Sequence, residues 1–169
     1  QLRMKWEDFD LRPQLRSSIF FPDCKLQFTN QFGFFVEQIA AAFPQQIDGF
    51  RRLVTRIAEH DALDLERSSM SARQVVSEYI RDPLLIDMIF CPLMFYGSAT
   101  PHDMDFSQFV IMFKSIFHEG FGRPFDGIRL ILKRLVKHFK SLGGHLKLRA
   151  GVQEIRRTNG VATSVLLDD

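Results

Sequence analysis

The spacing of the apolar residues between Gln31 and Leu142 is the feature that most restricts the fold of this chain. Along most of that stretch they recur every three or four positions, which is the period of an amphipathic helix. Before this stretch and after it, the pattern changes to short extended runs. The sequence therefore predicts an α+β protein that is mainly helical, with short strands at both ends.

Proline and capping residues divide the first part of the helical stretch. Pro44 falls between two helical runs in residues 31–60, at a place where a helix can begin but not comfortably continue. Ser71 is expected to be the N-cap of the next helix. Asp82-Pro83 repeats this start signal, and we expect Pro92 to interrupt the helix that follows.

The second part of the helical stretch contains two helices of different character. Asp105 can cap a helix that is apolar nearly all round, so that helix is either deeply buried or walls a pocket. After a glycine-bearing loop at residues 119–126, the run from Ile128 to Leu142 has one apolar and one basic face. The basic face could touch lipid head groups, although a solvated helix face is the simpler interpretation.

Four short extended runs are expected outside the helices. Three precede them, at Met4–Asp10, Ser17–Phe21 and Lys25–Thr29, and the residues from Leu146 to Arg149 alternate in the same way after them. Asn159-Gly160 lies between two further extended runs and predicts a type I′ hairpin turn.

Phenylalanine is unusually frequent, with 18 residues against two tyrosines and one tryptophan. It supplies apolar area without a polar group, so the chain has either a strongly aromatic core or a cavity for an apolar ligand. Composition leaves both explanations open.

Charge and cysteine content exclude several classes of protein. The net charge is only +2, which gives no strong field to attract nucleic acid. Cys24 and Cys91 lack the spacing of a metal site, and a single pair does not establish a disulfide. We expect free thiols in a reducing, cytoplasmic compartment, with peripheral contact with a membrane as the open alternative.

The familiar catalytic and phosphate-binding motifs are absent from the sequence. There is no GxGxxG, P-loop, GxSxG or HExxH. The densest polar cluster, His102-Asp103-Met104-Asp105, could be offered as a metal site, but helix capping explains it better. The sequence therefore predicts no catalytic residue and no metal ligand.

Several motifs, taken in order, resemble one enzyme family. They are Asp82-Pro-Leu-Leu, Cys91-Pro-Leu-Met-Phe-Tyr-Gly-Ser, Asp103-Met-Asp-Phe, Gly120-Phe-Gly-Arg-Pro-Phe-Asp-Gly and Leu142-Gly-Gly-His-Leu-Lys-Leu-Arg-Ala-Gly-Val-Gln-Glu-Ile. Together they look like the middle region of phytoene desaturases, carotenoid isomerases and retinol saturases. The resemblance extends from about Phe28 to the end of the chain.

This resemblance implies an FAD-dependent oxidoreductase in which a helical domain closes over a long apolar isoprenoid. Residues 1–144 would be the substrate-binding region, and residues 145–169 a strand and hairpin of the FAD domain. The chain begins at Gln1 and stops where relatives continue, so we expect a piece of a longer protein. The piece itself should not bind FAD, and it should self-associate through uncovered apolar surface.

The resemblance also suggests individual site residues. The proposed tunnel is lined by Phe90, Met94, Phe95, Tyr96, Phe106, Phe109 and Phe113, with Glu119 to Phe121 nearer the flavin. Val152 would present its backbone N–H and C=O to the adenine edge. For each of these residues, ordinary core packing is the competing explanation.

Two other functions remain open at this point. One is a non-catalytic helical module that binds an apolar ligand or scaffolds a partner. The other is an amine oxidase of the same superfamily, which would need an aromatic cage and a polar entrance that the abundance of phenylalanine does not favour.

Overall fold

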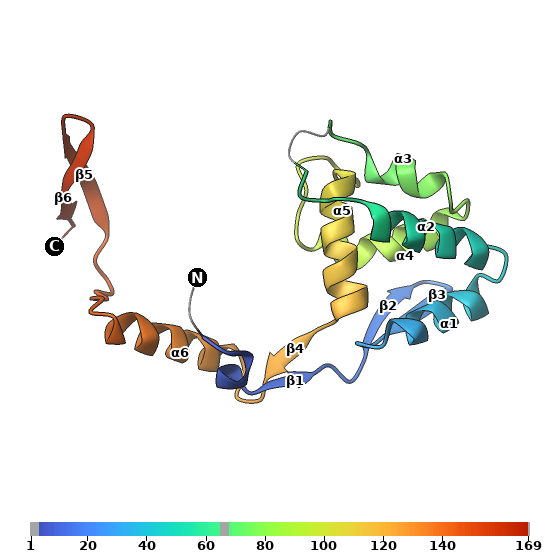
Figure 1. Ribbon diagram of the computed structural model, residues 1–169, viewed down its shortest axis with the longest axis horizontal. Coiled ribbons are helices and arrows are strands. Elements are labelled where there is room, and N and C mark those ends of the chain that lie inside the picture. Colours follow the sequence, from blue (N-terminus) through green and yellow to red (C-terminus); the bar gives the residue numbers. More distant parts are fainter. Residues whose placement is uncertain (1–3, 65–67, 169) are drawn as a thin grey trace. The chain divides into compact units, whose positions relative to one another are not determined.

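The structure is a computed structural model that describes residues 4–64 and 68–168, and it mixes helices with short strands (Figure 1). The chain runs through the following elements: η1 (Trp6–Phe9), β1 (Leu11–Pro13), β2 (Ser17–Phe21), β3 (Cys24–Phe28), α1 (Phe32–Ala42), α2 (Ile47–Glu59), α3 (Ala72–Ser77), α4 (Pro83–Met94), α5 (Phe106–Phe113), η2 (Lys114–Glu119), β4 (Gly122–Pro124), α6 (Ile128–Ser141), β5 (Val152–Thr158) and β6 (Val161–Leu167). The predicted α+β class is confirmed.

The chain forms two compact units. The helical unit consists of Leu11–Phe125, and the hairpin unit consists of residues 1–10 together with 126–169. The functional division at residue 144, which came from the family resemblance, stays a prediction.

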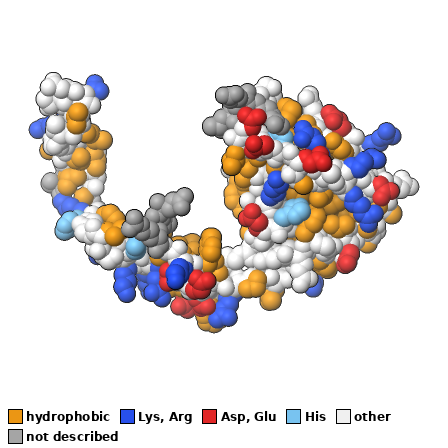
Figure 2. Space-filling view, viewed as in Figure 1, with side chains coloured by type: hydrophobic (Ala, Val, Ile, Leu, Met, Phe, Trp, Pro, Cys, Tyr) orange, Lys and Arg blue, Asp and Glu red, His pale blue; other side chains and the backbone are white. Residues whose placement is uncertain are grey.

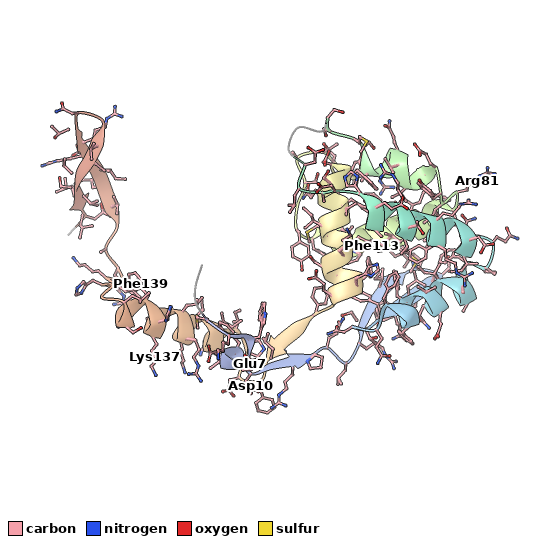
Figure 3. The ribbon with its side chains drawn as sticks, viewed as in Figure 1. Glu7, Asp10, Arg81, Phe113, Lys137 and Phe139 are labelled. Atoms are coloured by element: carbon pink, nitrogen blue, oxygen red, sulfur yellow. The ribbon has the colours of Figure 1, made fainter. Side chains whose placement is uncertain are left out.

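The core of the helical unit is largely aromatic. Nine of the 18 phenylalanines are buried, and all of them belong to this unit. Phe35 stacks on Phe117 with ring centroids 4.4 Å apart, and Phe28 meets the Phe117 ring edge-on at 5.0 Å. Phe113 lies among these helices (Figure 3) and contacts Phe117 at 5.0 Å. Aromatic packing therefore accounts for half of the phenylalanines and holds the unit together.

Local capping signals place the helix starts as predicted. Ser71 Oγ accepts a hydrogen bond from the backbone N–H of Gln74, and Asp82 accepts from the N–H groups of Leu84 and Leu85. Asp105 accepts from the N–H of Ser107 at the start of α5. These side chains satisfy N–H groups that have no partner inside the helix.

The polar cluster from His102 to Asp105, which precedes α5, also contributes to helix capping. Asp103 accepts hydrogen bonds from Ser71 Oγ, at 2.6 Å, and from the backbone N–H of Arg73, at 3.0 Å. Its carboxylate therefore ties this loop to the first turn of α3, while Asp105 caps α5. The capping interpretation of the cluster is confirmed.

One expectation about the long helices is wrong. Pro92 does not interrupt α4 but lies inside it, two residues before its end. A proline inside a helix removes one backbone N–H donor, and the buried side chains of Ile89, Phe90 and Leu93 hold the helix in place past it. The helix after Asp105 continues into the π-helical turn η2, which the sequence did not signal.

The strands of the helical unit are partly as predicted. The extended runs predicted at Ser17–Phe21 and Lys25–Thr29 are confirmed as strands β2 and β3, which pair with each other and place Ile19 opposite Leu26 in the core. Met4–Asp10 was expected to be extended, which is wrong, because Asp8 accepts a hydrogen bond from the N–H of Lys5 and closes the helical turn η1. The pairing of β1 with β4, between distant parts of the chain, was not predicted.

The hairpin unit consists of η1, α6 and the β5–β6 hairpin. Asn159 and Gly160 have φ values of 53° and 80°, as a type I′ turn requires. The expected strand Leu146–Arg149 is wrong, because Arg149 adopts a positive φ of 57° and the strand begins only at Val152.

No described side chain of the hairpin unit is buried. Phe139 and Lys137 project from different sides of α6 (Figure 3), and apolar side chains are visible along α6 and the hairpin in Figure 2. Ile155 and Val165 face each other across the hairpin and remain 63% and 53% exposed. A two-stranded ribbon with so little burial is marginal by itself.

No helix in residues 4–64 or 68–168 is long and apolar enough to cross a membrane.

Candidate functional site

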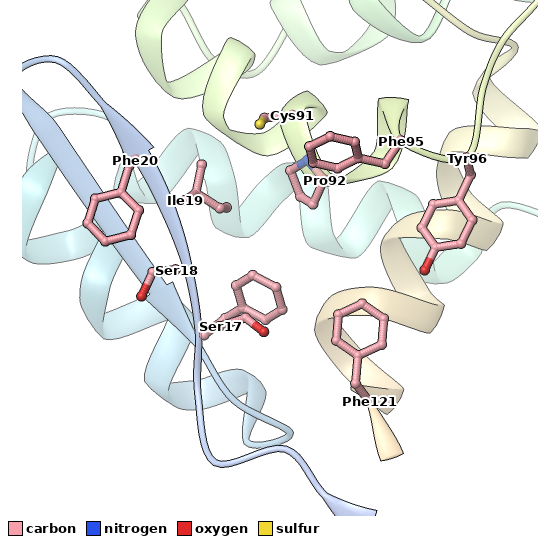
Figure 4. A pocket seen from close by; sticks show the side chains of 10 residues that line it. Ser17, Ser18, Ile19, Phe20, Cys91, Pro92, Phe95, Tyr96 and Phe121 are labelled. Atoms are coloured by element: carbon pink, nitrogen blue, oxygen red, sulfur yellow. The ribbon is translucent and has the colours of Figure 1, made fainter. Parts of the chain in front are cut away.

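The helical unit has an open groove with an apolar lining (Figure 4). Its volume is about 580 Å³. We call it the apolar groove and define it by the residues that line it: Ser17, Ser18, Ile19, Phe20, Phe28, Cys91, Pro92, Phe95, Tyr96 and Phe121. This size lies within the range of pockets for small molecules.

Three parts of the chain build the groove. The β2–β3 hairpin forms one side, with Phe28 contributed by β3, the end of α4 and the turn after it form another, and Phe121 forms the third. Tyr96 and Gly97 donate backbone hydrogen bonds to Leu93 and Met94, so the end of α4 curls over and brings two aromatic side chains to the groove.

Phe121 is held in place by an amide clamp. Asn30 Nδ2 donates to the carbonyl of Phe121, and the N–H of Phe121 donates to Asn30 Oδ1, both at 3.0 Å. Gly120, with a φ of 76°, allows the backbone to approach Asn30 closely. The clamp therefore fixes one wall of the groove relative to β3 and α1.

The aromatic rim of the groove is largely open to solvent. Phe95 is 85% exposed, Phe20 is 71% exposed and Tyr96 is 59% exposed. Large aromatic side chains that gather at one hollow and stay exposed form an apolar patch, and such patches mark binding surfaces.

The groove offers no charge to a ligand. None of its lining residues is an acid, a lysine or an arginine. Burial raises the pKa of the Cys91 thiol, so this group stays protonated at neutral pH. Lys25 lies at the rim, 5.0 Å from the ring centre of Phe20, and does not line the groove. The groove therefore suits an uncharged, apolar molecule.

The residues proposed for the tunnel fall into two groups. Phe95, Tyr96 and Phe121 line the apolar groove. The others do not line it: Phe90, Phe106, Phe109 and Phe113 are fully buried in the core, Met94 is half-buried against it, and Glu119 is exposed at the end of η2.

Sequence reasoning did not predict that β2, or Cys91 and Pro92 of α4, would line the groove. Ser17, Ser18, Ile19 and Phe20 come from a strand whose position beside α4 is not encoded locally. The one sequence signal for these residues was the alternation of side chains between the two faces of a strand. A phenylalanine next to a buried isoleucine lies on the opposite, outer face of the strand.

A second, smaller hollow lies beside the π-helical turn. It has a volume of about 290 Å³ and combines Val54, Ile57 and Ala58 of α2 with Lys114, His118 and Glu119. His118 stacks on Phe32 with centroids 3.9 Å apart. Partial burial, together with the charge of Lys114, lowers the pKa of His118.

The described residues do not fit FAD by themselves. Val152 is 56% exposed at the start of β5, opposite Leu167. The turn between β4 and α6 has one glycine at its helix start, Gly127, and carries Asp126, whose carboxylate would repel a pyrophosphate.

Among residues 4–64 and 68–168, no three histidine, cysteine or acidic side chains lie close enough together to hold a metal ion.

No family model, curated protein or solved structure matches this chain.

Proposed function

We propose that this chain is the substrate-side part of an FAD-dependent oxidoreductase related to the phytoene desaturases, and that the apolar groove receives a long isoprenoid. One observation carries the proposal. Two of the motifs that resemble this family, which are separated in the sequence, meet in the same groove. The motif from Cys91 supplies four lining residues, and the motif from Gly120 supplies Phe121.

The chemistry of the lining supports an isoprenoid over the other substrates of the superfamily. A hydrocarbon chain gains from contact with Phe95, Phe20 and the other rings, because their apolar area is removed from water. An amine substrate would enter as a cation, and the lining has no carboxylate to receive it. An amine oxidase is therefore the poorer candidate.

The flavin would be held by segments outside these 169 residues. In such an enzyme FAD carries out the hydride chemistry, and the protein positions the substrate and excludes water. The helical unit fits this role, because it offers an apolar groove and no obvious acid or base in the groove lining.

Binding of retinol, a fluorescent isoprenoid, tests the role of the groove. The fluorescence of retinol should rise on titration with the chain, and Phe95→Ser should weaken binding about tenfold, as expected when roughly half of a phenylalanine side chain no longer buries apolar area.

Phe125→Ser provides the matched control. Phe125 is 76% exposed in the same unit but lies outside the groove, so its loss should leave retinol affinity unchanged. Equal affinity of wild type and Phe95→Ser would refute the groove as the binding site.

A non-catalytic binding module is the second candidate. The helical unit encloses its own aromatic core, as an independent ligand-binding domain would. A flavin-binding strand and helix in the same reading frame would favour the enzyme over the non-catalytic binding module.

A further inference from the structure

We propose that an open hollow between η1 and α6 binds a phosphate group carried on a hydroxylated body, such as glycerol 3-phosphate. The hollow belongs to the hairpin unit and shares no residue with the apolar groove. The inference therefore goes beyond the proposed function and does not depend on it.

The hollow is built by one face of α6 together with η1. We call it the η1–α6 hollow and define it by the residues that line it: Met4, Asp8, Arg134, Lys137, His138 and Ser141. The four residues from α6 recur at intervals of three or four positions, so they lie on one face of the helix. Asp8 belongs to η1, which contacts α6 within the same compact unit (Figure 1). Distant parts of the sequence thus bring opposite charges to one hollow.

Helix α6 carries positive charge that has no partner on the helix itself. Lysine and arginine side chains gather along it in Figure 2. Its 14 residues contain no acid and five cations, which are Arg129, Lys133, Arg134, Lys137 and Lys140. None of these cations forms an ion pair with a described residue. Like charges four residues apart destabilise a helix, so an anionic ligand would relieve the repulsion at the two cations that line the hollow.

Arg134 and Lys137 give the hollow two positive charges. Both side chains donate hydrogen bonds and accept none, which matches the negatively charged oxygens of a phosphate. His138 adds a ring that carries at least one N–H in either protonation state. These groups form the phosphate side of the hollow.

Asp8 and Ser141 give the hollow two hydrogen-bond acceptors. Asp8 Oδ2 accepts from the backbone N–H of Lys5 at 3.0 Å, and its Oδ1 accepts from no described residue. Ser141 Oγ donates its only hydrogen to the carbonyl of His138 at 2.7 Å, so it can only accept from a ligand. The Asp8 carboxylate would repel a bare phosphate or sulfate, whereas O–H groups beside the phosphate can donate to both acceptors. The lining therefore selects a hydroxylated phosphate over a bare anion.

Glycerol 3-phosphate and methyl phosphate test the inference, because both are phosphate monoesters and only the first has hydroxyl groups. Calorimetric titration of the whole chain measures both affinities. Wild type should bind glycerol 3-phosphate about fivefold more tightly than methyl phosphate, the effect of one ordinary hydrogen bond. Asp8→Asn should bring this ratio toward one, because methyl phosphate no longer meets a negative charge and the hydroxyl groups lose a charged acceptor.

A matched pair of double variants separates the hollow from the general charge of α6. One carries Arg134→Gln and Lys137→Gln, which remove two cations of the lining. The other carries Lys133→Gln and Lys140→Gln, which remove two cations of the same helix outside the lining. The first should weaken glycerol 3-phosphate binding about tenfold, and the second by less than about twofold. Circular dichroism should show the same helix content in both.

Vesicles distinguish a free phosphate from a lipid head group, because phosphatidylglycerol carries the same glycerol beside its phosphate. If a head group is the ligand, wild type should bind phosphatidylglycerol vesicles more tightly than phosphatidylcholine vesicles. The Arg134 and Lys137 double variant should lose this difference, and the Lys133 and Lys140 double variant should keep it. Binding of soluble glycerol 3-phosphate without any difference between the vesicles assigns the site to a free phosphate.

Three results would overturn the inference. Equal losses in the two double variants would show that the overall charge of α6 explains the binding. Equal affinity of wild type for glycerol 3-phosphate and methyl phosphate would overturn the selection of a hydroxylated ligand. Absence of glycerol 3-phosphate binding, together with equal binding of the two kinds of vesicle, would contradict the site altogether.

Discussion

Gly120→Ala should destabilise the helical unit strongly, because glycine is required there for two separate reasons. Gly120 has φ 76° and ψ −165°, a region that is essentially restricted to glycine and costs other residues about 1–3 kcal/mol. An added Cβ would also collide with Asn30, including its backbone Cα at 2.9 Å. Moving Asn30 breaks its two hydrogen bonds to Phe121, each with a net contribution of about 1 kcal/mol. We expect a total loss of about 4 kcal/mol in the free energy of unfolding.

Gly97→Ala separates the two causes. Gly97 also has a positive φ, 84°, but an added Cβ would have no neighbour within 4 Å. Its replacement should cost only about 1–2 kcal/mol. Urea denaturation followed by circular dichroism measures both losses.

A double-mutant cycle tests the contact with Asn30 directly. In an Asn30→Ala background the two hydrogen bonds to Phe121 are already lost, so Gly120→Ala should cost about 2 kcal/mol less than in wild type, while the conformational cost and the close approach to the backbone at position 30 remain. Equal losses for Gly97→Ala and Gly120→Ala, or strict additivity with Asn30→Ala, would refute the reasoning.

Four further outcomes are expected. Asp105→Ala removes a side chain that accepts hydrogen bonds from Ser69 Oγ and from the N–H groups of Met70 and Ser107. Urea denaturation should show that the free energy of unfolding falls by about 2 kcal/mol. A decrease below about 0.5 kcal/mol would contradict this capping role. The pKa of His118 lies below its ordinary value of 6.5 in the folded chain, so below about pH 6.5 the unfolded chain binds more protons and the folded chain loses stability. His118→Phe should therefore reduce the dependence of the unfolding free energy on pH below about 6.5. An unchanged dependence would count against this role of His118. In the full-length enzyme, Val152→Pro removes a backbone donor and should weaken FAD binding by about 1–3 kcal/mol. Val152→Ala keeps the donor and should leave FAD binding unchanged. Equal FAD affinity of the two variants would exclude Val152 from the adenine site. The exposed apolar faces of α6 and the hairpin should cause self-association, visible by sedimentation, and a monomer at high concentration that binds no hydrophobic dye would be inconsistent with this.

Local chemistry made most of the helical architecture predictable from the sequence. Ser71, Asp82 and Asp105 each cap a helix by bonding N–H groups two or three residues away. The Asn159-Gly160 turn likewise depends only on the positive φ values of its own residues. These features need no knowledge of the rest of the fold.

Packing between distant segments explains what the sequence did not show. Pro92 reads as a helix breaker, but burial of its neighbours keeps α4 intact past it. The pairing of β1 with β4 joins two three-residue strands that carry no strong pattern of their own.

The candidate site was foreseeable only in part for the same reason. Phe95, Tyr96 and Phe121 belong to motifs that could be recognised in the sequence, whereas Ser17 and Phe20 reach the groove only because β2 packs beside α4. Phe106 and Phe109 could not be told from groove residues by spacing, since a fully buried helix and a pocket wall share the same apolar pattern.

The absorbance of bound flavin in the complete protein tests the central claim most directly. The full reading frame should purify with one FAD per chain, and addition of an isoprenoid in the absence of oxygen should change the flavin spectrum. The same change should require a higher isoprenoid concentration in the Phe95→Ser variant. A full-length protein that carries no flavin would contradict the proposed function.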